Sequence, residues 1–188
     1  MKLSSLFGDN AVLQRNIPIP VWGWTDPSKR IRIQIGDNVA ETMAGKDGKF
    51  MARLSPMPVG GPFELIVTVA GSSKKLRLKN IMIGDVWLAS GQSNMGCLLS
   101  QTGKSGIDEI NLPEDEDIRT INIPHQALLG IQSDIEAKWV TASPRFKPQF
   151  SAVAYYFAKK LKNELGVTIG IIHSSWGGTM IESWISRE

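Results

Sequence analysis

The stretch IMIGDVWLASGQSNM, Ile81–Met95, carries the features that decide the fold. Its first part, Ile81–Ser90, is almost continuously apolar, which is typical of a parallel β-strand covered on both faces. The residues that follow are small and polar, and they place Ser93 between the amides of Gln92 and Asn94. The stretch therefore predicts a strand of an α/β layer with a serine at its carboxyl end, where open sheets place their ligand sites.

Downstream of this strand, the sequence predicts the rest of an α/β layer. Ile118–Ile123 and Val167–His173 are further candidate strands. Ser151 is placed as the N-cap of a helix for which Gly166 is the stop signal. Residues 96–117 contain Gly and Ser and then an acidic run, which indicates a surface excursion that is helical in part. The apolar residues on one face of the predicted helix are Val153, Ala154, Phe157, Leu161 and Leu165.

Residues 1–80 show a different pattern, in which short segments of apolar or of alternating apolar and polar residues recur at close spacing between turn signals. Asp47-Gly48 between alternating flanks predicts a β-hairpin. We interpret the chain as α+β and multi-domain: a β-sandwich over residues 1–80, then an incomplete α/β parallel sheet over residues 81–188. The predicted strands of the first part are Ile19–Trp24, Ile31–Ile35, Val39–Met43, Phe50–Leu54, Phe63–Val69 and Leu76–Leu78.

Composition and charge argue against several classes of protein. The chain has 188 residues, 42% of them hydrophobic, which is enough for a buried core. A net charge of +3 is only mildly basic, and the basic residues at 74–79 alternate with apolar ones as on a solvated strand, so no nucleic-acid partner is expected. The single Cys97 excludes an internal disulfide and a cysteine-based metal cluster. No cofactor or metal is expected, and neither a membrane-spanning stretch nor a secretory leader is visible.

Ser93 has two interpretations on spacing alone. It can be an ordinary N-cap in a strand-to-helix turn, or a nucleophile beside free backbone N–H groups that stabilise negative charge. A second small-residue loop, Ser174–Thr179 (SSWGGT), follows the strand Val167–His173. Its Gly177 and Gly178 either expose a backbone donor to an oxyanion or only turn the chain. Because both loops follow parallel strands of one sheet, each strengthens the functional interpretation of the other.

Together these blocks resemble the sialate O-acetylesterase family of SGNH-type hydrolases, which are carbohydrate esterases. GDVWLASGQSNM (84–95) and SSWGGTMIESW (174–184) carry the resemblance. LFGDNAVLQRNIPIPVWGW (6–24) and FSAVAYYFAKKL (150–161) extend it over nearly the whole chain.

The resemblance implies that Ser93 attacks an acetyl ester on a sugar, such as sialic acid. The N–H of Ser93 and one from Gly178 or Gly177 are implied as part of an oxyanion hole, and Gln92 and Asn94 are assigned to the substrate side. The resemblance also suggests export to the periplasm or out of the cell, with an acetylated sugar as the partner. Because no leader is visible, a cytoplasmic location stays open, and no membrane association is expected because the apolar runs are only strand-length.

The general base that the resemblance implies is missing. In the family, later Gln-Gly-Glu and Asp-x-x-His blocks complete the site, and no aspartate of this chain is followed three residues later by histidine. We assign His173 a structural or substrate-side role and His125 a surface role. The chain alone is thus expected to be nearly inactive. The alternative function is a non-catalytic carbohydrate-binding or interaction module derived from the esterase.

The number of predicted strands has a consequence for the sheet. An open sheet of this type has about five parallel strands, and only three are predicted. We expect Val167–Ile172 to pair beside Ile81–Ser90 and to leave its outer edge unpaired, and an apolar edge promotes association. The chain is therefore predicted to be a fragment, or to have its sheet completed by self-association or by a missing carboxyl-terminal segment.

Overall fold

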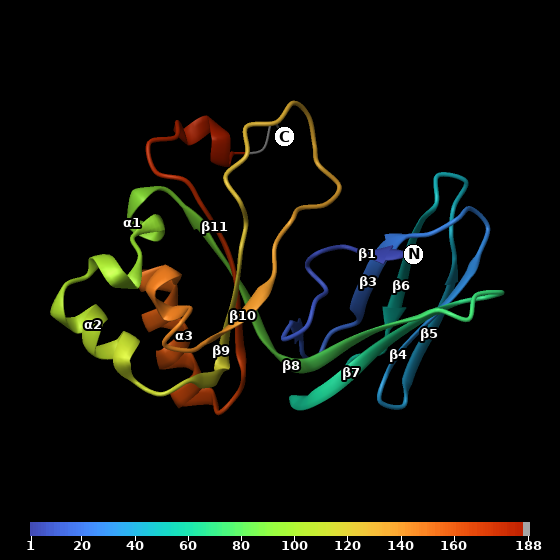
Figure 1. The fold of residues 1–188 in the computed structure, drawn as a ribbon, viewed down its shortest axis with the longest axis horizontal. Helices are drawn as coiled ribbons and strands as arrows, with labels where there is room; N and C mark the ends of the chain where they lie inside the picture. The colour runs from blue at the N-terminus through green and yellow to red at the C-terminus, as the bar shows by residue number, and fades with distance from the viewer. Residues whose placement is uncertain (186–188) are drawn as a thin grey trace.

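The computed structural model describes residues 1–185, which form a mixed α/β structure with two β-sheets and few helices (Figure 1). The three-stranded sheet has the order β1-β3-β6, and the eight-stranded sheet has the order β10-β9-β11-β8-β7-β4-β5, with β2 paired to β8. The strands are β1 (Lys2–Leu3), β2 (Val12–Gln14), β3 (Ile19–Trp24), β4 (Arg30–Ile35), β5 (Asn38–Met43), β6 (Lys49–Leu54), β7 (Gly60–Val69), β8 (Lys75–Gly91), β9 (Asp115–Asn122), β10 (Trp139–Ala142) and β11 (Ile169–Ser175). The helical segments are α1 (Ser93–Gly96), η1 (Leu99–Gln101), α2 (Lys104–Asn111), η2 (Lys147–Gln149), α3 (Ala152–Leu165) and η3 (Ile181–Trp184).

Alternation of apolar and polar residues explains the strands of the amino-terminal half. Strands β3, β4 and β6 each bury every second side chain, and the buried residues of these three strands, which come from both sheets, belong to one core cluster. The strands predicted from β3 to β7 are confirmed. The hairpin predicted at Asp47-Gly48 is wrong, because this turn joins β5 to β6 and these strands lie in different sheets. Instead, β5 pairs with β4 and β6 pairs with β3.

One long strand, β8, joins the two halves of the molecule (Figure 1). It pairs antiparallel with β7 in its first part and parallel with β11 from Asp85 to Gly91. The prediction of separate strands at Leu76–Leu78 and Ile81–Ser90 is wrong, because Asn80 adopts a φ of +55° without ending the strand. The predicted domain boundary between residues 80 and 81 lies inside this strand.

The parallel strands of the large sheet pair with a further strand at one outer edge, and within residues 1–185 their other outer edge is unpaired. Strand β11 lies beside β8, as predicted, but β9 pairs with its other edge, so the prediction of an unpaired edge at Val167–Ile172 is wrong. Strand β10, which the sequence did not predict, pairs antiparallel with β9. Within residues 1–185, β8 pairs only with β11 beyond Gly84. Its exposed Trp87 and Leu88, 45% and 68% accessible, contradict the prediction of a strand covered on both faces.

Helix α3 packs against β9 and β11 and begins and ends as the sequence predicts. The Ser151 hydroxyl accepts a hydrogen bond from the Ala154 N–H at 3.2 Å, and Gly166 follows the helix with a φ of +64°. The predicted apolar face is only partly buried: Ala154 lies in the core, while Val153, Phe157 and Leu165 are exposed. Phe157 packs edge-on against Trp87 at 5.1 Å between ring centroids, beside the open edge of β8. The residues of α3 that are fully buried are Ala152, Ala154, Tyr155 and Ala158.

No helix in the described part of the chain is long and apolar enough to span a membrane.

Candidate functional site

A pocket of about 760 Å³ lies where β8, β9 and β11 end, at the carboxyl edge of the parallel strands. Open α/β sheets commonly bind ligands at this edge. The pocket receives residues from four segments: the turn after β8, the ends of β9 and β11, and the segment before α3. Its lining residues are Ser93, Asn94, Gly96, Cys97, Leu98, Gln101, Asn122, Ile123, His125, Gln149, His173, Ser175 and Gly177.

Ser93 is exposed and is the first residue of the one-turn helix α1. The chain turns sharply before it because Gly91 adopts a φ of +139°, a conformation that other residues rarely adopt. The interpretation of Ser93 as an N-cap is wrong, because Gln92 holds that position and no side chain caps the helix. The interpretation of Ser93 as a nucleophile stays a prediction. Ser93 lies at a strand-to-helix turn and its side chain also lines the pocket.

The loop Ser174–Thr179 lies against the turn that carries Ser93. The Trp176 N–H donates a hydrogen bond to the Gly91 carbonyl at 3.0 Å, and the Gln92 side-chain amide donates to the Thr179 carbonyl. A Cβ atom on Gly177 would lie 3.4 Å from the Ser93 Cα and 3.5 Å from its Cβ. The two loops that the sequence placed at one sheet edge are thus in direct contact, with the backbone of Gly177 beside Ser93.

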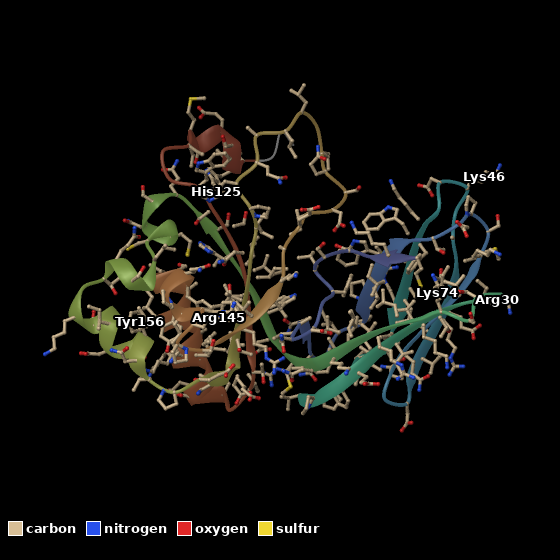
Figure 2. The ribbon with its side chains drawn as sticks, viewed as in Figure 1. Arg30, Lys46, Lys74, His125, Arg145 and Tyr156 are labelled. Carbon is tan, nitrogen blue, oxygen red and sulfur yellow. The ribbon has the colours of Figure 1, made fainter. Side chains whose placement is uncertain are left out.

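Two histidines lie on the same side of this pocket. The His125 ring stacks on Trp176, with 4.7 Å between centroids and 6° between planes, and its Nε2 lies 2.6 Å from the Ser175 carbonyl oxygen. Figure 2 shows His125 at this end of the molecule, near the carboxyl-terminal segment. His173 is buried, and burial is the main cause that lowers its pKa, so its imidazole is favoured in the neutral form.

His173 forms hydrogen bonds at both ring nitrogens. Its Nε2 lies 2.7 Å from the Ser175 hydroxyl oxygen, and its Nδ1 lies 3.2 Å from Asn122 Oδ1. Asn122 and His173 are register partners at the ends of neighbouring parallel strands. This chain of three side chains lies within the same pocket as Ser93.

The predicted site residues separate into two groups. Ser93, Asn94 and Gly177 line the pocket. Gln92 and Gly178 are not among the lining residues: Gln92 connects the two loops through its hydrogen bond to Thr179, and Gly178, at a φ of +77°, turns the second loop. Asn122 and Ser175 were not predicted to belong to the site. Their positions at the carboxyl ends of two predicted parallel strands were the available signal. Among residues 1–185, no group of three or more His, Cys, Asp and Glu side chains is arranged to hold a metal ion.

The fold and site thus define an α/β protein with a pocket at the carboxyl edge of its parallel strands, where an exposed serine faces a glycine-containing loop. Known proteins are similar to this chain in sequence and in fold. The human protein named sialate O-acetylesterase is 29% identical over 203 residues, covering 98% of this chain and 39% of its own length. The Mus musculus protein of the same name is 31% identical over 184 residues, covering 89% of this chain and 34% of its own.

A solved structure agrees with these relatives. The crystal structure of a carbohydrate acetylesterase from Xanthomonas citri matches with a TM-score of 0.93 and 36% identity, covering 98% of this chain and 42% of that one. No protein-family model matches the chain. The chain is therefore a relative of the sialate O-acetylesterases. It is matched over nearly its whole length, and it spans well under half the length of these relatives.

Proposed function

We propose that this chain is the part of a carbohydrate O-acetylesterase that carries the nucleophile, Ser93. The observation that supports this most strongly is the exposed Ser93 in a pocket beside the backbone of Gly177, in a chain related to acetylesterases. The substrate class is an acetyl ester on a sugar, with sialic acid as one candidate. The amino-terminal strands act as a β-sandwich beside an SGNH-type sheet, and the protein works in the periplasm or outside the cell.

In the proposed reaction, the Ser93 hydroxyl oxygen attacks the acetyl carbonyl carbon. The backbone N–H of Ser93 and that of Gly177 or Gly178 stabilise the oxyanion that forms. A histidine base takes the hydroxyl proton and returns it to the leaving sugar oxygen, and water then releases acetate from the acetylated serine. The family resemblance implies that this base belongs to an Asp-x-x-His segment. The chain alone is therefore expected to turn over acetylated sugars very slowly.

The same relationship suggests what completes the sheet. The unpaired edge of β8 at Trp87–Ser90 has the backbone groups that a further strand needs, and Trp87, Leu88 and Phe157 form an apolar surface beside it. We propose that, in a longer polypeptide, a strand of the remaining sequence pairs with this edge. Without that strand, the edge promotes self-association of the chain.

Sedimentation velocity tests this second proposal. We expect the chain to associate with increasing concentration, and Leu88→Lys to shift it towards monomer because a lysine on an edge strand opposes pairing. Leu129→Lys is the matched control, because Leu129 is fully exposed in a distant loop, and it should leave association unchanged. A chain that stays monomeric at every concentration would contradict the proposal.

The esterase proposal is tested in a chimera that supplies the rest of the site. In it, this chain replaces the matched part of the Xanthomonas citri acetylesterase, and acetate release from an O-acetylated sugar is measured. We expect turnover by the chimera, and a loss of roughly 10³-fold or more in Ser93→Ala, because the covalent step needs this hydroxyl. Ser100→Ala on η1 is the control for an exposed serine that does not line the pocket. Full turnover by the Ser93→Ala chimera would show that another residue is the nucleophile.

A further inference from the structure

Ser175, His173 and Asn122 form a hydrogen-bonded series that the proposed esterase reaction does not use. The Ser175 hydroxyl oxygen lies 2.7 Å from His173 Nε2, and His173 Nδ1 lies 3.2 Å from Asn122 Oδ1. Ser175 and His173 are buried yet line the pocket, and Asn122 is exposed to it. A hydroxyl, an imidazole and an orienting side chain in this order form the arrangement of a serine nucleophile with its base.

The surroundings of Asn122 determine which nitrogen of His173 carries the proton. The Asn122 side-chain NH₂ donates to the Gln149 carbonyl at 3.5 Å, and Asn122 Oδ1 lies 3.4 Å from Thr120 Oγ1, which also donates to the Ile171 carbonyl at 3.2 Å. With its NH₂ group directed to Gln149, Asn122 presents its amide oxygen to His173, and we assign the ring proton to Nδ1, which donates to this oxygen. Nε2 is then left with its lone pair and accepts from the Ser175 hydroxyl. Burial favours this neutral imidazole because it lowers the pKa of His173.

Ser175 lines the pocket beside a residue that has no side chain. Gly96 lies directly beside this hydroxyl, because a Cβ atom on Gly96 would be 3.3 Å from Ser175 Oγ. The absence of a side chain at Gly96 therefore keeps that side of the hydroxyl uncrowded. Ser175 is only 5% exposed, which restricts access to small groups such as acetyl.

We propose that Ser175 is a second nucleophile, activated by His173 and oriented through Asn122, that accepts the acyl group of small esters with good leaving groups. Its oxygen forms a bond to the acyl carbon while the bond from that carbon to the leaving aryl oxygen breaks. His173 Nε2 takes the hydroxyl proton and returns it to the leaving oxygen. The products are acetylated Ser175 and a phenol. This inference does not rest on Ser93 or on an external base.

Acetylation of the 188-residue chain by p-nitrophenyl acetate tests the inference, with the modified residue located by peptide mass spectrometry. We expect acetylated Ser175. Its rate of formation should fall roughly 10²-fold or more in His173→Gln, because glutamine can hydrogen-bond but cannot take up the proton. Asn122→Ala should slow it less, since the base is retained but less well oriented. In Ser93→Ala, an acetyl group mapped to Ser175 cannot have passed through Ser93.

Two controls keep the result interpretable. Ser100→Ala reports on general damage from a serine substitution, and a thermal melt of each variant shows whether it folds. If Ser175→Ala does not fold, Ser175→Cys retains a nucleophile at the same position and should be acetylated in its place. Acetyl groups found at Ser93 alone, no acetylated residue at 175, or acetylation of Ser175 that is unaffected by His173→Gln would each overturn the inference. None of these results decides whether Ser93 acts in the chimera.

Discussion

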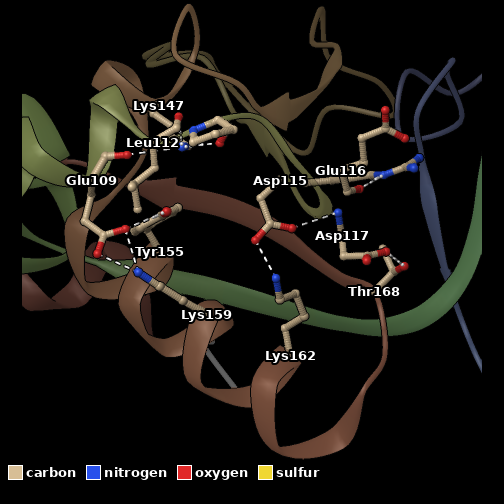
Figure 3. A network of polar contacts seen from close by, with 12 residues as sticks. Glu109, Leu112, Asp115, Glu116, Asp117, Lys147, Tyr155, Lys159, Lys162 and Thr168 are labelled. Carbon is tan, nitrogen blue, oxygen red and sulfur yellow. Dashed lines mark hydrogen bonds and ion pairs between the residues drawn. The ribbon is translucent and has the colours of Figure 1, made fainter.

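The two ends of the parallel strands use polar residues in opposite ways. At the amino ends, charged side chains pair with one another in a closed network (Figure 3). At the carboxyl ends, Ser93, Asn122, His125, His173 and Ser175 face a pocket of about 760 Å³. The first arrangement engages its charged groups in contacts within the protein, and the second leaves the Ser93 hydroxyl exposed and favours the neutral form of the His173 imidazole. The difference indicates which polar residues stabilise the fold and which are available for chemistry.

Lys147 best illustrates how a charged side chain is held in the network at the amino ends of the strands. Its side chain is almost fully buried, and its ammonium donates to the carbonyl oxygens of Glu109, Leu112 and Pro113 at 3.1, 2.8 and 2.9 Å. Burial is the main cause that lowers its pKa. Nearby, Lys159 binds the Glu109 carboxylate at 2.5 and 2.7 Å, and Lys162 binds Asp115 at 2.6 Å. These contacts hold α2 and the start of β9 against α3.

Lys147→Met should disrupt the polar contacts at the amino ends of the parallel strands, and we expect it to lower stability the most. We expect the free energy of unfolding to fall by about 2–3 kcal/mol, because three carbonyls lose one charged donor and face an apolar side chain. Chemical denaturation measures the change. Lys160→Met is the matched control on α3, where an exposed ion pair with Glu164 is worth only about 0.3–0.5 kcal/mol. Equal losses in the two variants would show that the buried network is no stronger than a surface pair.

At the carboxyl end, Gly177 and Gly178 should respond differently to alanine. Gly178→Ala should cost about 1–2 kcal/mol, because a side chain at its φ of +77° is strained although the space around it is open. Gly177→Ala should change stability less, since its new methyl group meets Ser93 only at ordinary contact distance. That methyl group should instead lower turnover in the chimera, because it crowds the nucleophile. Denaturation and acetate release separate the two effects, and the reverse pattern would contradict the assigned positions.

The smallest expected effect is a pH dependence from His173. Burial lowers its pKa in the folded state below the value of about 6.5 for the unfolded chain. Below that pH, the unfolded state binds a proton that the folded state does not, so stability should fall as the pH drops through this value. Positive charge on nearby His125 acts in the same direction. Denaturation at pH 7 and pH 5.5 should show a smaller loss in His173→Gln than in the unsubstituted chain, and an equal loss would argue against a buried neutral imidazole.

Much of the fold follows from local patterns in the sequence. Alternation located β3 to β7, and Ser151 and Gly166 located the ends of α3, because these signals act within a few residues. Strands β2 and β10 were missed because they contain too few residues to show a period. The pairing of β9 with the outer edge of β11 also eluded prediction, because pairing between strands is a tertiary property that no local pattern encodes.

For the site, too, the residues marked by a local pattern were predicted, and the contacts between distant residues were not. Ser93 and Gly177 were found because each lies in a small-residue turn directly after an apolar strand. His173 and Asn122 were not connected, because their contact depends on the parallel register of β9 and β11, which joins residues 51 positions apart. In the sequence, Ser175 is only one of several small residues of its loop. Its contact with the His173 imidazole becomes evident only in the folded structure.

The contrast between the two ends can be tested in one comparison, the acetate release of the chimera carrying Ser93→Ala or Lys162→Met. Ser93 lies at the carboxyl edge, and Lys162 forms its ion pair with Asp115 at the amino edge. We predict that Ser93→Ala loses turnover by roughly 10³-fold or more, while Lys162→Met lowers stability and keeps its turnover when folded. Retained turnover in Ser93→Ala, or a comparable loss in folded Lys162→Met, would contradict the assignment of chemistry to the carboxyl end.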